Sequence, residues 1–421
     1  MVGPEPLPKG YEHLTPEMCL ACKGGKALCG MPCLWLAKID ARLPQFRLTS
    51  QDVFGSSPPS VFVGRYGYPR VSLGPMLPPV KLPEAKALEL EDAPAWLDQR
   101  IEDVVGLRSA LLRARRPMRV DAARQPPRLL EITQELALSH KPVDTEIHLA
   151  KRPNLELRAR LGDVNAPMGP SVEPDRVRLT QNPTVKPLVE RIHGDDDVKA
   201  STAIGELYRG GITPYRIEKL LSVGILGQRN DRKLVPTRWA ITATDDQIGL
   251  QLIPKVKELP ELDAVHYHEG VSHGNRFHVF LVPRPWSFDM IETWLKGAMW
   301  SLETSPFIED HEDLRGRRKY AANVTGAYYA ARLSALEHLL ALRRQASVFV
   351  YREITPDYWA PLGVWLIREG VKRALASKPN VFPDMASALD FGRPRTLRQG
   401  WDRASWLLGN AMKQRRIVDF A

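Results

Sequence analysis

All four cysteines of this 421-residue chain lie within fifteen consecutive positions, in the run MCLACKGGKALCGMPCLW. Their spacing is Cys19-x2-Cys22-x6-Cys29-x3-Cys33. Thiols this close in sequence can converge on one ion, and four thiolates complete the tetrahedral shell that Zn²⁺ prefers. A disulfide framework would instead spread its cysteines through a small secreted domain. The cluster therefore predicts a compact structural zinc site, with a redox dithiol and an iron–sulfur cluster as the alternatives.

The overall composition is that of an ordinary globular protein. Hydrophobic residues make up 43% of the chain and charged residues 26%, so it can bury a large core without help from a metal. No apolar run is long enough to span a bilayer, and residues 1–9 lack a signal-peptide pattern. We therefore expect a soluble, cytoplasmic protein without membrane contact, whose thiols stay reduced. The net charge of +10 favours a polyanionic partner.

Turn residues and hydrophobic periodicity predict a mixed α/β fold. Gly and Pro interrupt residues 54–79 so often that no helix can persist there. Two short β-type runs remain on either side of Tyr66-Gly67-Tyr68-Pro69, which predicts a hairpin whose turn carries aromatic and arginine side chains. Further strands are predicted within 145–193 and at 234–243, 264–270, 275–286 and 346–353, and helices within 90–140 and at 289–302, 325–345 and 359–376.

The chain divides into three expected parts. Residues 1–47 hold the cysteines in a Pro- and Gly-rich setting and form the predicted zinc-binding module. Residues 48–410 form the predicted mixed α/β body, with a subdivision near residues 90–145 left open. Residues 411–421 form a predicted tail that binds a partner.

The tail carries a short motif of its own. In QRRIVDFA, Gln414, Ile417 and Phe420 occupy positions one, four and seven. A box that binds a sliding clamp has this shape, because one 3₁₀ turn presents an aliphatic and an aromatic side chain as a plug while the glutamine enters a separate pocket. The eighth position is Ala421 instead of a second aromatic residue, so one anchor is missing. The alternative is a charged helix end with two apolar residues.

Basic residues are concentrated near the C-terminus. Between Arg368 and Arg416 there are eleven Lys and Arg against four Asp and Glu, and LRGRRKY at 314–320 adds a second basic run. Arginines neutralise phosphates in a salt-sensitive, sequence-independent way. Trp401, Trp406 and Tyr320 either stack on bases between these charges or belong to the core beneath a solvated surface. The candidate nucleic-acid contacts are Arg315, Arg317, Arg318, Arg393, Arg395 and Arg398.

An enzyme acting on nucleotides or DNA is the alternative class of function. In HYHEGVSHGNRFH, His266 and His268 are two positions apart, so in a strand they would point to one face as two metal ligands must. The stretch matches no fixed metalloprotease signature, and packed hairpin histidines explain it equally well. The site of this alternative is expected among the candidate nucleotide- or phosphate-binding residues Arg65, Tyr66, Arg238, Asp245 and Asp246 and the His266–His278 hairpin.

Several separated blocks together resemble one family. These blocks are MCLACKGGKALCGMPC, SSPPSVFVGRYGYPRVSLGPM, LVPTRWAITATDD, GAYYAARLSALEHL and REITPDYWAPLGVWLIRE, and with the segments between them they resemble the archaeal Nre family of DNA repair proteins from Cys19 to Phe420. The resemblance implies an N-terminal zinc finger, a role in the DNA damage response, and binding to the sliding clamp PCNA through the C-terminal motif. It implies no reaction, so catalytic residues remain unassigned.

Overall fold

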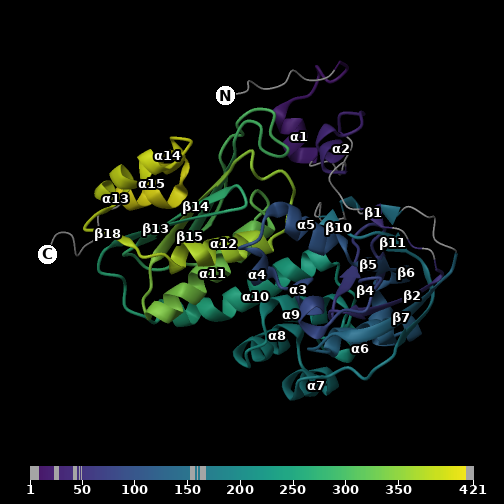
Figure 1. The fold of residues 1–421 in the computed structure, drawn as a ribbon. Helices are drawn as coiled ribbons and strands as arrows, with labels where there is room; N and C mark the ends of the chain where they lie inside the picture. Colours follow the sequence, from purple (N-terminus) through teal and green to yellow (C-terminus); the bar gives the residue numbers. More distant parts are fainter. Residues whose placement is uncertain are drawn as a thin grey trace. The chain divides into compact units, whose positions relative to one another are not determined.

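The protein is described here by a computed structural model, which covers residues 9–22, 28–40, 45–46, 48, 50–151, 157–158, 160–161 and 167–413. The chain divides into two compact units. Unit 1 comprises Met1–Ala37 and Gly249–Ala421, and unit 2 comprises Lys38–Ile248. The boundary between them falls inside helix α10 (Thr237–Lys257). Each unit contains both helices and strands (Figure 1), so the predicted mixed α/β class is confirmed.

The described part of unit 1 centres on a six-stranded sheet with the order β16-β15-β17-β14-β13-β18. β13 (Val265–Ser272) and β14 (Asn275–Val282) form the hairpin predicted around the histidines. Both residues of its turn, His273 and Gly274, have positive φ (48° and 69°), as the type I′ turn of a two-residue hairpin requires. β15 and β17 run parallel, and the other pairs are antiparallel. The remaining strands are β15 (Ser287–Trp294), β16 (Ile308–Glu312), β17 (Ser347–Ile354) and β18 (Asn380–Phe382).

Helices cover both faces of this sheet (Figure 1). α11 (Gly326–Leu342) and α12 (Trp365–Ala376) pack on one face, and α11 is apolar around almost its whole circumference because it is nearly all buried. On the other face, α13 (Met385–Gly392), α14 (Trp401–Ala404) and α15 (Trp406–Lys413) close an apolar cluster over the strands. Across the described residues, no helix combines the length and the apolar character needed to cross a bilayer.

Two sheets and several short helices make up much of the described part of unit 2. One sheet has the order β11-β5-β4-β3 with β6 paired to β4, and the other has the order β12-β7-β2. Apolar residues of both sheets and of α6 share one core, which includes Val53, Leu77, Ile132 and Ile147. β3 and β4 pair antiparallel around Tyr66–Pro69, so the predicted hairpin is confirmed. The bounds are β2 (Asp52–Ser57), β3 (Val61–Val63), β4 (Arg70–Leu77), β5 (Leu112–Ala114), β6 (Arg116–Arg119), β7 (Val143–Leu149), β11 (Ser171–Val172), β12 (Pro174–Leu179), α3 (Glu84–Glu89), α4 (Ala93–Trp96), α5 (Ile101–Ser109), α6 (Arg128–Leu138), α7 (Pro187–Gly194), α8 (Ala200–Arg209) and α9 (Pro214–Ser222), with the short pairs β1 (Gln45–Phe46) with β8 (Leu157–Arg158) and β9 (Arg160–Leu161) with β10 (Pro167–Met168).

Two predicted elements are wrong. Residues 234–243 were expected to form a strand, but α10 begins there. β-branched residues favour a strand locally, yet Ala240, Ile248, Leu252 and Val256 are buried at multiples of four positions, which is the period of a helix face.

The second wrong element is the helix predicted at 289–302, where the structure has β15. All eight residues of β15 are buried. A strand that is buried on both faces lacks the alternation of apolar and polar residues, so its sequence pattern cannot be distinguished from that of a buried helix. Elsewhere the strand at 346–353 (β17) and the helix at 325–345 (α11) are confirmed, the helix at 359–376 begins later, at Trp365 (α12), and residues 90–140 contain β5 and β6 besides their helices.

A buried carboxyl fixes the C-terminal helices to the sheet of unit 1. Oδ2 of Asp289 in β15 accepts hydrogen bonds from Ser405 Oγ (2.6 Å) and from the backbone N of Leu407 (3.0 Å), at the start of α15. Among the described residues, Oδ1 of Asp289 has no hydrogen-bond partner. Burial raises the pKa of Asp289 from 3.8 to about 7, and the carboxylate of Glu309 adds to the rise against these hydrogen bonds.

This raised pKa predicts that stability falls as the pH rises. Between pH 3.8 and about pH 7, Asp289 is deprotonated in the unfolded chain and still protonated in the folded chain. Its contribution to the free energy of unfolding is therefore complete below the lower pH and is lost as the pH rises past the upper one. Asp289→Asn removes this loss. We expect the free energy of unfolding of the wild type to fall relative to that of the variant by up to about 1.4 kcal/mol per pH unit.

Urea titrations between pH 4 and pH 8 measure this difference. Asp263→Asn, at an exposed position of the same unit, is the control and should run parallel to the wild type. Parallel curves for Asp289→Asn would contradict the prediction.

Candidate metal centre and nucleic-acid interface

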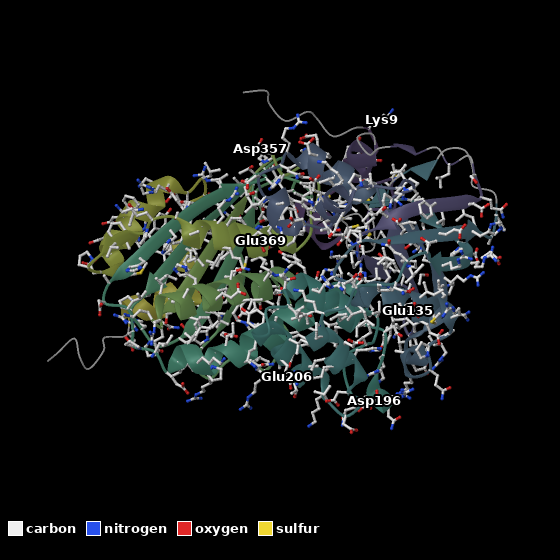
Figure 2. The ribbon with its side chains drawn as sticks, turned by 60° about the horizontal axis from the view of Figure 1, so that its bottom comes forward. Lys9, Glu135, Asp196, Glu206, Asp357 and Glu369 are labelled. Atoms are coloured by element: carbon white, nitrogen blue, oxygen red, sulfur yellow. The ribbon has the colours of Figure 1, made fainter. Side chains whose placement is uncertain are left out.

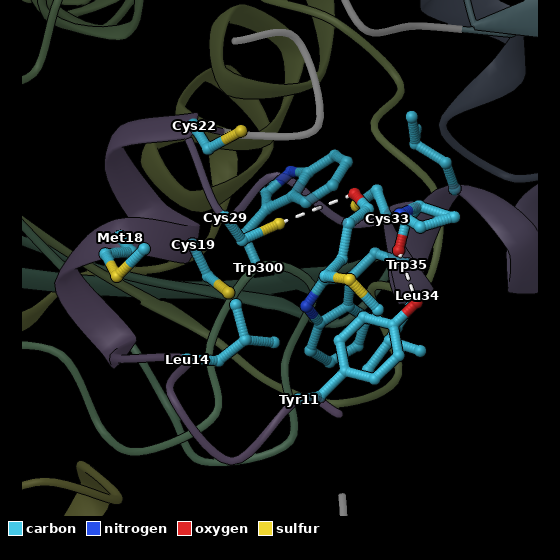
Figure 3. A pocket seen from close by; sticks show the side chains of 13 residues that line it. Tyr11, Leu14, Met18, Cys19, Cys22, Cys29, Cys33, Leu34, Trp35 and Trp300 are labelled. Carbon is cyan, nitrogen blue, oxygen red and sulfur yellow. Dashed lines mark hydrogen bonds between the residues drawn. The ribbon is translucent and has the colours of Figure 1, made fainter. Parts of the chain in front are cut away.

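The four cysteines line a single cavity in unit 1 (Figure 3). Cys19 and Cys22 lie one turn apart on α1 (Pro16–Cys22), and Cys33 directly precedes α2 (Leu34–Asp40). The cavity has a volume of about 140 Å³, and most of its wall is apolar. The predicted ligands are therefore brought together around one space. Other residues that line it are Tyr11, Leu14, Met18, Met31, Trp35 and Trp300.

Contacts from outside the cysteine run support this cavity. Tyr11 Oη donates to the carbonyl of Pro32 (2.8 Å), and Nε2 of His13 lies 3.0 Å from the carbonyl oxygen of Cys29. Trp300 has a positive φ of 65° and lines the cavity although it lies far from the cysteines in sequence. Sequence reasoning missed Trp300, because nothing in a local pattern connects position 300 with the cysteines.

The electrostatics of the cavity suit a cation. Burial raises the pKa of Cys19 to about 11, and the thiols of Cys33, Cys29 and Cys22 add to the rise. Burial also raises the pKa of Cys33. The four sulfurs are thus close enough that thiolates would destabilise one another, and a bound metal ion reverses this effect because it stabilises the thiolate. The donor set fits Zn²⁺ in its chemistry.

The sulfurs share the cavity without meeting at one point. Across the described residues, no three His, Cys, Asp or Glu side chains are arranged so that they could hold a metal ion. Cys29 Sγ instead donates to the carbonyl of Met31 at 3.5 Å. Residues 23–27, which connect the two pairs of cysteines, lie outside the described part of the chain. Zinc at this position is a proposal that the cavity supports.

The histidines of the β13–β14 hairpin point to different faces of the sheet. His266 and His268 share one face, as expected, and His268 contacts His338 of α11 with ring centroids 5.4 Å apart. His278 pairs with Glu269 in register, so it lies on the opposite face. Burial lowers the pKa of His268 to about 4, which keeps this ring neutral. Packing against α11 therefore explains the position of His268 without a bound metal.

On the other face, His278 belongs to a buried polar network. Its Nδ1 lies 2.7 Å from Tyr267 Oη, and its Nε2 lies 3.5 Å from Glu353 Oε2. Burial alone would raise the pKa of Glu353, but the nearby His278 and hydrogen bonds from the backbone N–H groups of Arg398 and Leu397 hold this pKa below its usual value. The network therefore ties the segment after η3 (Arg393–Arg395) to β17.

The basic run at 314–320 is partly available to a partner. Arg315 and Arg318 are exposed. Arg317 is half-buried and donates to Asp310 at 2.6 Å. Tyr320 is 53% exposed. Arg315 and Arg318 can thus contact a phosphate, whereas Arg317 would first have to give up its ion pair with Asp310.

The three arginines at 393–398 have partners inside unit 1. Arg393 forms ion pairs with Asp402 (2.8 Å) and Asp390 (3.0 Å). Arg398 donates to Thr293 Oγ1 at 2.6 Å. Arg395 donates to the carbonyl of Phe391 (2.9 Å), and its guanidinium lies over the ring of that residue. All three are half-buried, so a phosphate would compete with these contacts.

The tryptophans of the basic region belong to the fold. Trp401 is fully buried in the apolar cluster under α13–α15, which confirms the core alternative for this residue. Trp406 stacks on His311 with ring centroids 4.4 Å apart. Tyr320, by contrast, is exposed, and its ring stacks on that of Tyr329 with centroids 5.6 Å apart.

The residues of the predicted nucleotide site lie at the β3–β4 turn and along α10. Arg65 and Tyr66 lie in the β3–β4 turn, and Arg238 is exposed at the start of α10. Asp245 is buried and Asp246 half-buried on α10, so the strand end assumed for these carboxylates is the interior of a helix. All five lie in unit 2, whereas the histidine hairpin lies in unit 1. Gln414, Ile417 and Phe420 lie outside the described residues.

A polar cavity of about 410 Å³ opens in unit 2 beside α6 and η2 (Arg229–Asp231). Its lining includes Glu135 and Arg232. Asp196, labelled with Glu135 in Figure 2, pairs with Arg229 (2.9 Å) and Arg232 (3.2 Å). Burial, and then Arg232, lower the pKa of His193 on the same wall. Arg229 and Arg232 are thus paired within the unit, and Glu131 and Glu135 line the same cavity.

The fold and the cysteine cavity define a class: a mixed α/β protein with an N-terminal four-cysteine segment. Two family models match the chain in succession, the archaeal Nre N-terminal region over residues 28–301 and the archaeal Nre C-terminal region over residues 312–420. The chain belongs to the archaeal Nre family, which confirms the resemblance found in the sequence. Cys29 and Cys33 lie inside the first match, and Cys19 and Cys22 precede it.

Named relatives agree with this assignment. The chain is 39% identical over 383 residues to a protein of Archaeoglobus fulgidus named DNA repair protein NreA, covering 91% of this chain and 95% of the relative. It is 39% identical over 346 residues to DNA repair protein NreA of Haloferax volcanii, covering 81% and 80%. A second Archaeoglobus fulgidus protein, DNA repair protein NreB, is 36% identical over 378 residues, covering 89% and 92%. No solved structure gives a significant match.

The cysteine cavity generates a prediction about metal content. The purified protein should carry one zinc ion per chain, and Cys22→Ser should reduce zinc content and increase proteolysis within the first ~50 residues only, because the rest of the chain has its own cores. Elemental analysis and limited proteolysis measure both effects. Met18→Ser, which changes the same cavity wall without removing a thiol, is the matched control. Iron in place of zinc, or a well-folded preparation without metal, would disprove the assignment.

Proposed function

We propose that this chain is a DNA repair factor that a sliding clamp recruits to DNA through residues 414–420. The observation that carries the proposal is the 39% identity along 91% of the chain to a protein named DNA repair protein NreA. A structural zinc ion in the cysteine cavity and a basic surface that contacts DNA complete the proposal.

The clamp contact is supported by the spacing of three anchors. Gln414, Ile417 and Phe420 match the glutamine, aliphatic and first aromatic positions of a clamp-binding box. The match to the archaeal Nre C-terminal region extends to residue 420, so the motif lies within the family region. Ala421 fills the place of the second aromatic residue, which lowers the apolar area available for the clamp pocket.

The DNA contact is supported by the exposed charges of the 314–320 segment. Arg315 and Arg318 are exposed in unit 1, and the segment also carries Lys319 and the exposed side chain of Tyr320. Such a surface binds phosphates without reading base sequence. The arginines at 393–398 add positive potential to unit 1 while holding their internal partners.

The clamp contact generates the sharpest prediction of this function. Truncating a buried anchor commonly costs ~2 kcal/mol, so Phe420→Ala should weaken binding to the cognate clamp about thirtyfold, and Ile417→Ala should weaken it severely too. Deleting residues 414–421 should abolish binding and leave the zinc content unchanged. Ala421→Phe should tighten binding, because it restores the missing aromatic anchor. Calorimetry with the purified clamp measures all four affinities.

Asp419→Ala is the matched control for the clamp experiment. It lies between the anchors and is not one of them, so its affinity should stay close to that of the wild type. If the deletion variant binds the clamp as tightly as the intact chain does, these residues are an ordinary charged chain end and the recruitment proposal fails.

The basic surface generates a separate prediction about salt dependence. Arg315→Ala with Arg318→Ala should weaken duplex DNA binding and lower the slope of log K against log salt by about two, because each phosphate contact contributes about 0.9. Anisotropy titrations at several salt concentrations measure the slope. Arg128→Ala removes an exposed arginine of unit 2 and is the control. An unchanged slope in the double variant would show that the 314–320 segment does not face DNA.

A further inference from the structure

Exposed aromatic side chains gather where the β3–β4 turn meets the start of α10 in unit 2. Tyr66 and Tyr68 lie in the turn, and Trp239 lies in the first turn of the helix. Their exposed fractions are 56%, 51% and 44%. The ring centroids of Tyr68 and Trp239 are 5.1 Å apart, with their planes at 56°. Two segments distant in sequence thus form one aromatic surface, which we call the Tyr–Trp platform (Tyr66, Tyr68 and Trp239).

The backbone beneath the platform is held in place. Gly67 has a φ of +81°, and a Cβ at this position would lie 2.7 Å from the carbonyl oxygen of Arg70, so the turn requires glycine here. The backbone N of Arg70 donates to the carbonyl of Gly67 at 2.8 Å. The backbone N of Val63 donates to Thr237 Oγ1 at 3.0 Å, which joins β3 to the start of α10. The rigid backbone keeps these large rings exposed to water. Exposed apolar area of this kind is typical of interaction surfaces.

Arginines flank the platform. The guanidinium of Arg65 lies 5.0 Å from the centre of the Tyr66 ring. Arg70 of β4 lies directly opposite Arg119 of β6, and both are exposed. Arg119 pairs with Asp121 at 2.9 Å. Two like charges at opposed positions destabilise a sheet, and an anion placed between them relieves that repulsion.

Exposed aromatic rings beside arginines fit one class of ligand. Unpaired bases stack on aromatic side chains while the phosphates of the same strand meet positive charge. A duplex hides its base faces inside the helix and offers these rings nothing to stack on, and an acidic peptide would use the arginines without the rings.

We propose that the Tyr–Trp platform stacks on unpaired bases of single-stranded DNA while the flanking arginines contact its phosphates. The choice of DNA rests on the proposed function. The choice of a single strand rests on the exposed rings alone. The platform lies in unit 2, whereas the 314–320 segment lies in unit 1, so the two contacts can be separated by mutation.

Anisotropy with a labelled oligothymidylate of about 20 nucleotides, and with a duplex of equal length, tests the proposal on the full chain. Tyr68→Ala and Trp239→Ala should each weaken binding to the single strand about tenfold, since stacking on one aromatic side chain supports a loss of roughly 5- to 150-fold. Binding to the duplex should be unchanged. Tyr68→Phe and Trp239→Phe keep a ring face and should restore most of the affinity.

Salt dependence separates stacking from charge in the same assay. Arg70→Ala should lower the slope of log K against log salt by about 0.7, the value for one phosphate of a single strand, whereas Trp239→Ala should leave the slope unchanged. Phe54→Ala is the matched control, because Phe54 is an exposed aromatic residue of the same unit (41%) outside the platform. Its affinity for the single strand should equal that of the wild type.

Several outcomes would overturn the proposal. If the alanine variants bind the single strand as tightly as the wild type does, the platform does not contact DNA. This result would not affect the interpretation of the clamp experiment. Equal losses for single strand and duplex would show a general DNA contact instead of base stacking. Tighter binding of a ribo-oligomer of equal length would assign the platform to RNA. A wild-type chain that binds no single strand at low salt would also refute it, whereas only a negative clamp result refutes recruitment.

Discussion

The burial of β17 between β14 and β15 is the constraint on which unit 1 depends. A charged side chain in a strand covered on both faces needs a partner at that place, because an unpaired buried charge is strongly destabilising. Arg352 and Glu353 are neighbours, yet they point to opposite faces. Arg352 therefore pairs with Asn275 and Glu292 of the adjacent strands, while Glu353 binds the backbone of the segment after η3. One strand thus fixes both the register of the sheet and the path of the chain that crosses it.

Internal pairing of this kind reduces the number of basic side chains that are available to an anionic partner. The net charge of +10 and the basic C-terminal stretch suggest an extended phosphate-binding surface. In the structure, much of that charge is engaged in the fold, as Arg393 with Asp402 shows. Other positive side chains are exposed in both units, with Arg318 in one and Arg70 in the other. A count of basic residues therefore overstates the area that meets an anion.

The sequence predicted local features well where a turn or a period was decisive. The hairpin around Tyr66–Pro69 and the helix α11 followed from Gly, Pro and the apolar pattern. α10 was mispredicted because its β-branched residues favour a strand locally, and β15 because burial on both faces hides the period, which only tertiary packing resolves. The shared cavity of the four cysteines could be predicted because they are close in sequence, whereas Trp300 and the contact between Tyr68 and Trp239 depend on the folded path of the chain.

The two family regions meet between residues 301 and 312, and this junction lies within unit 1. β13, β14 and β15 belong to the first region, and β17 belongs to the second, so the long ladders of β14 with β17 and of β15 with β17 join the two. A gene split at this junction would give one product lacking the central strand β17 and another carrying that strand with both edges open. The two regions are therefore expected to be inherited as one polypeptide, and exchange of a single region between relatives would succeed only where the strand pairing is preserved.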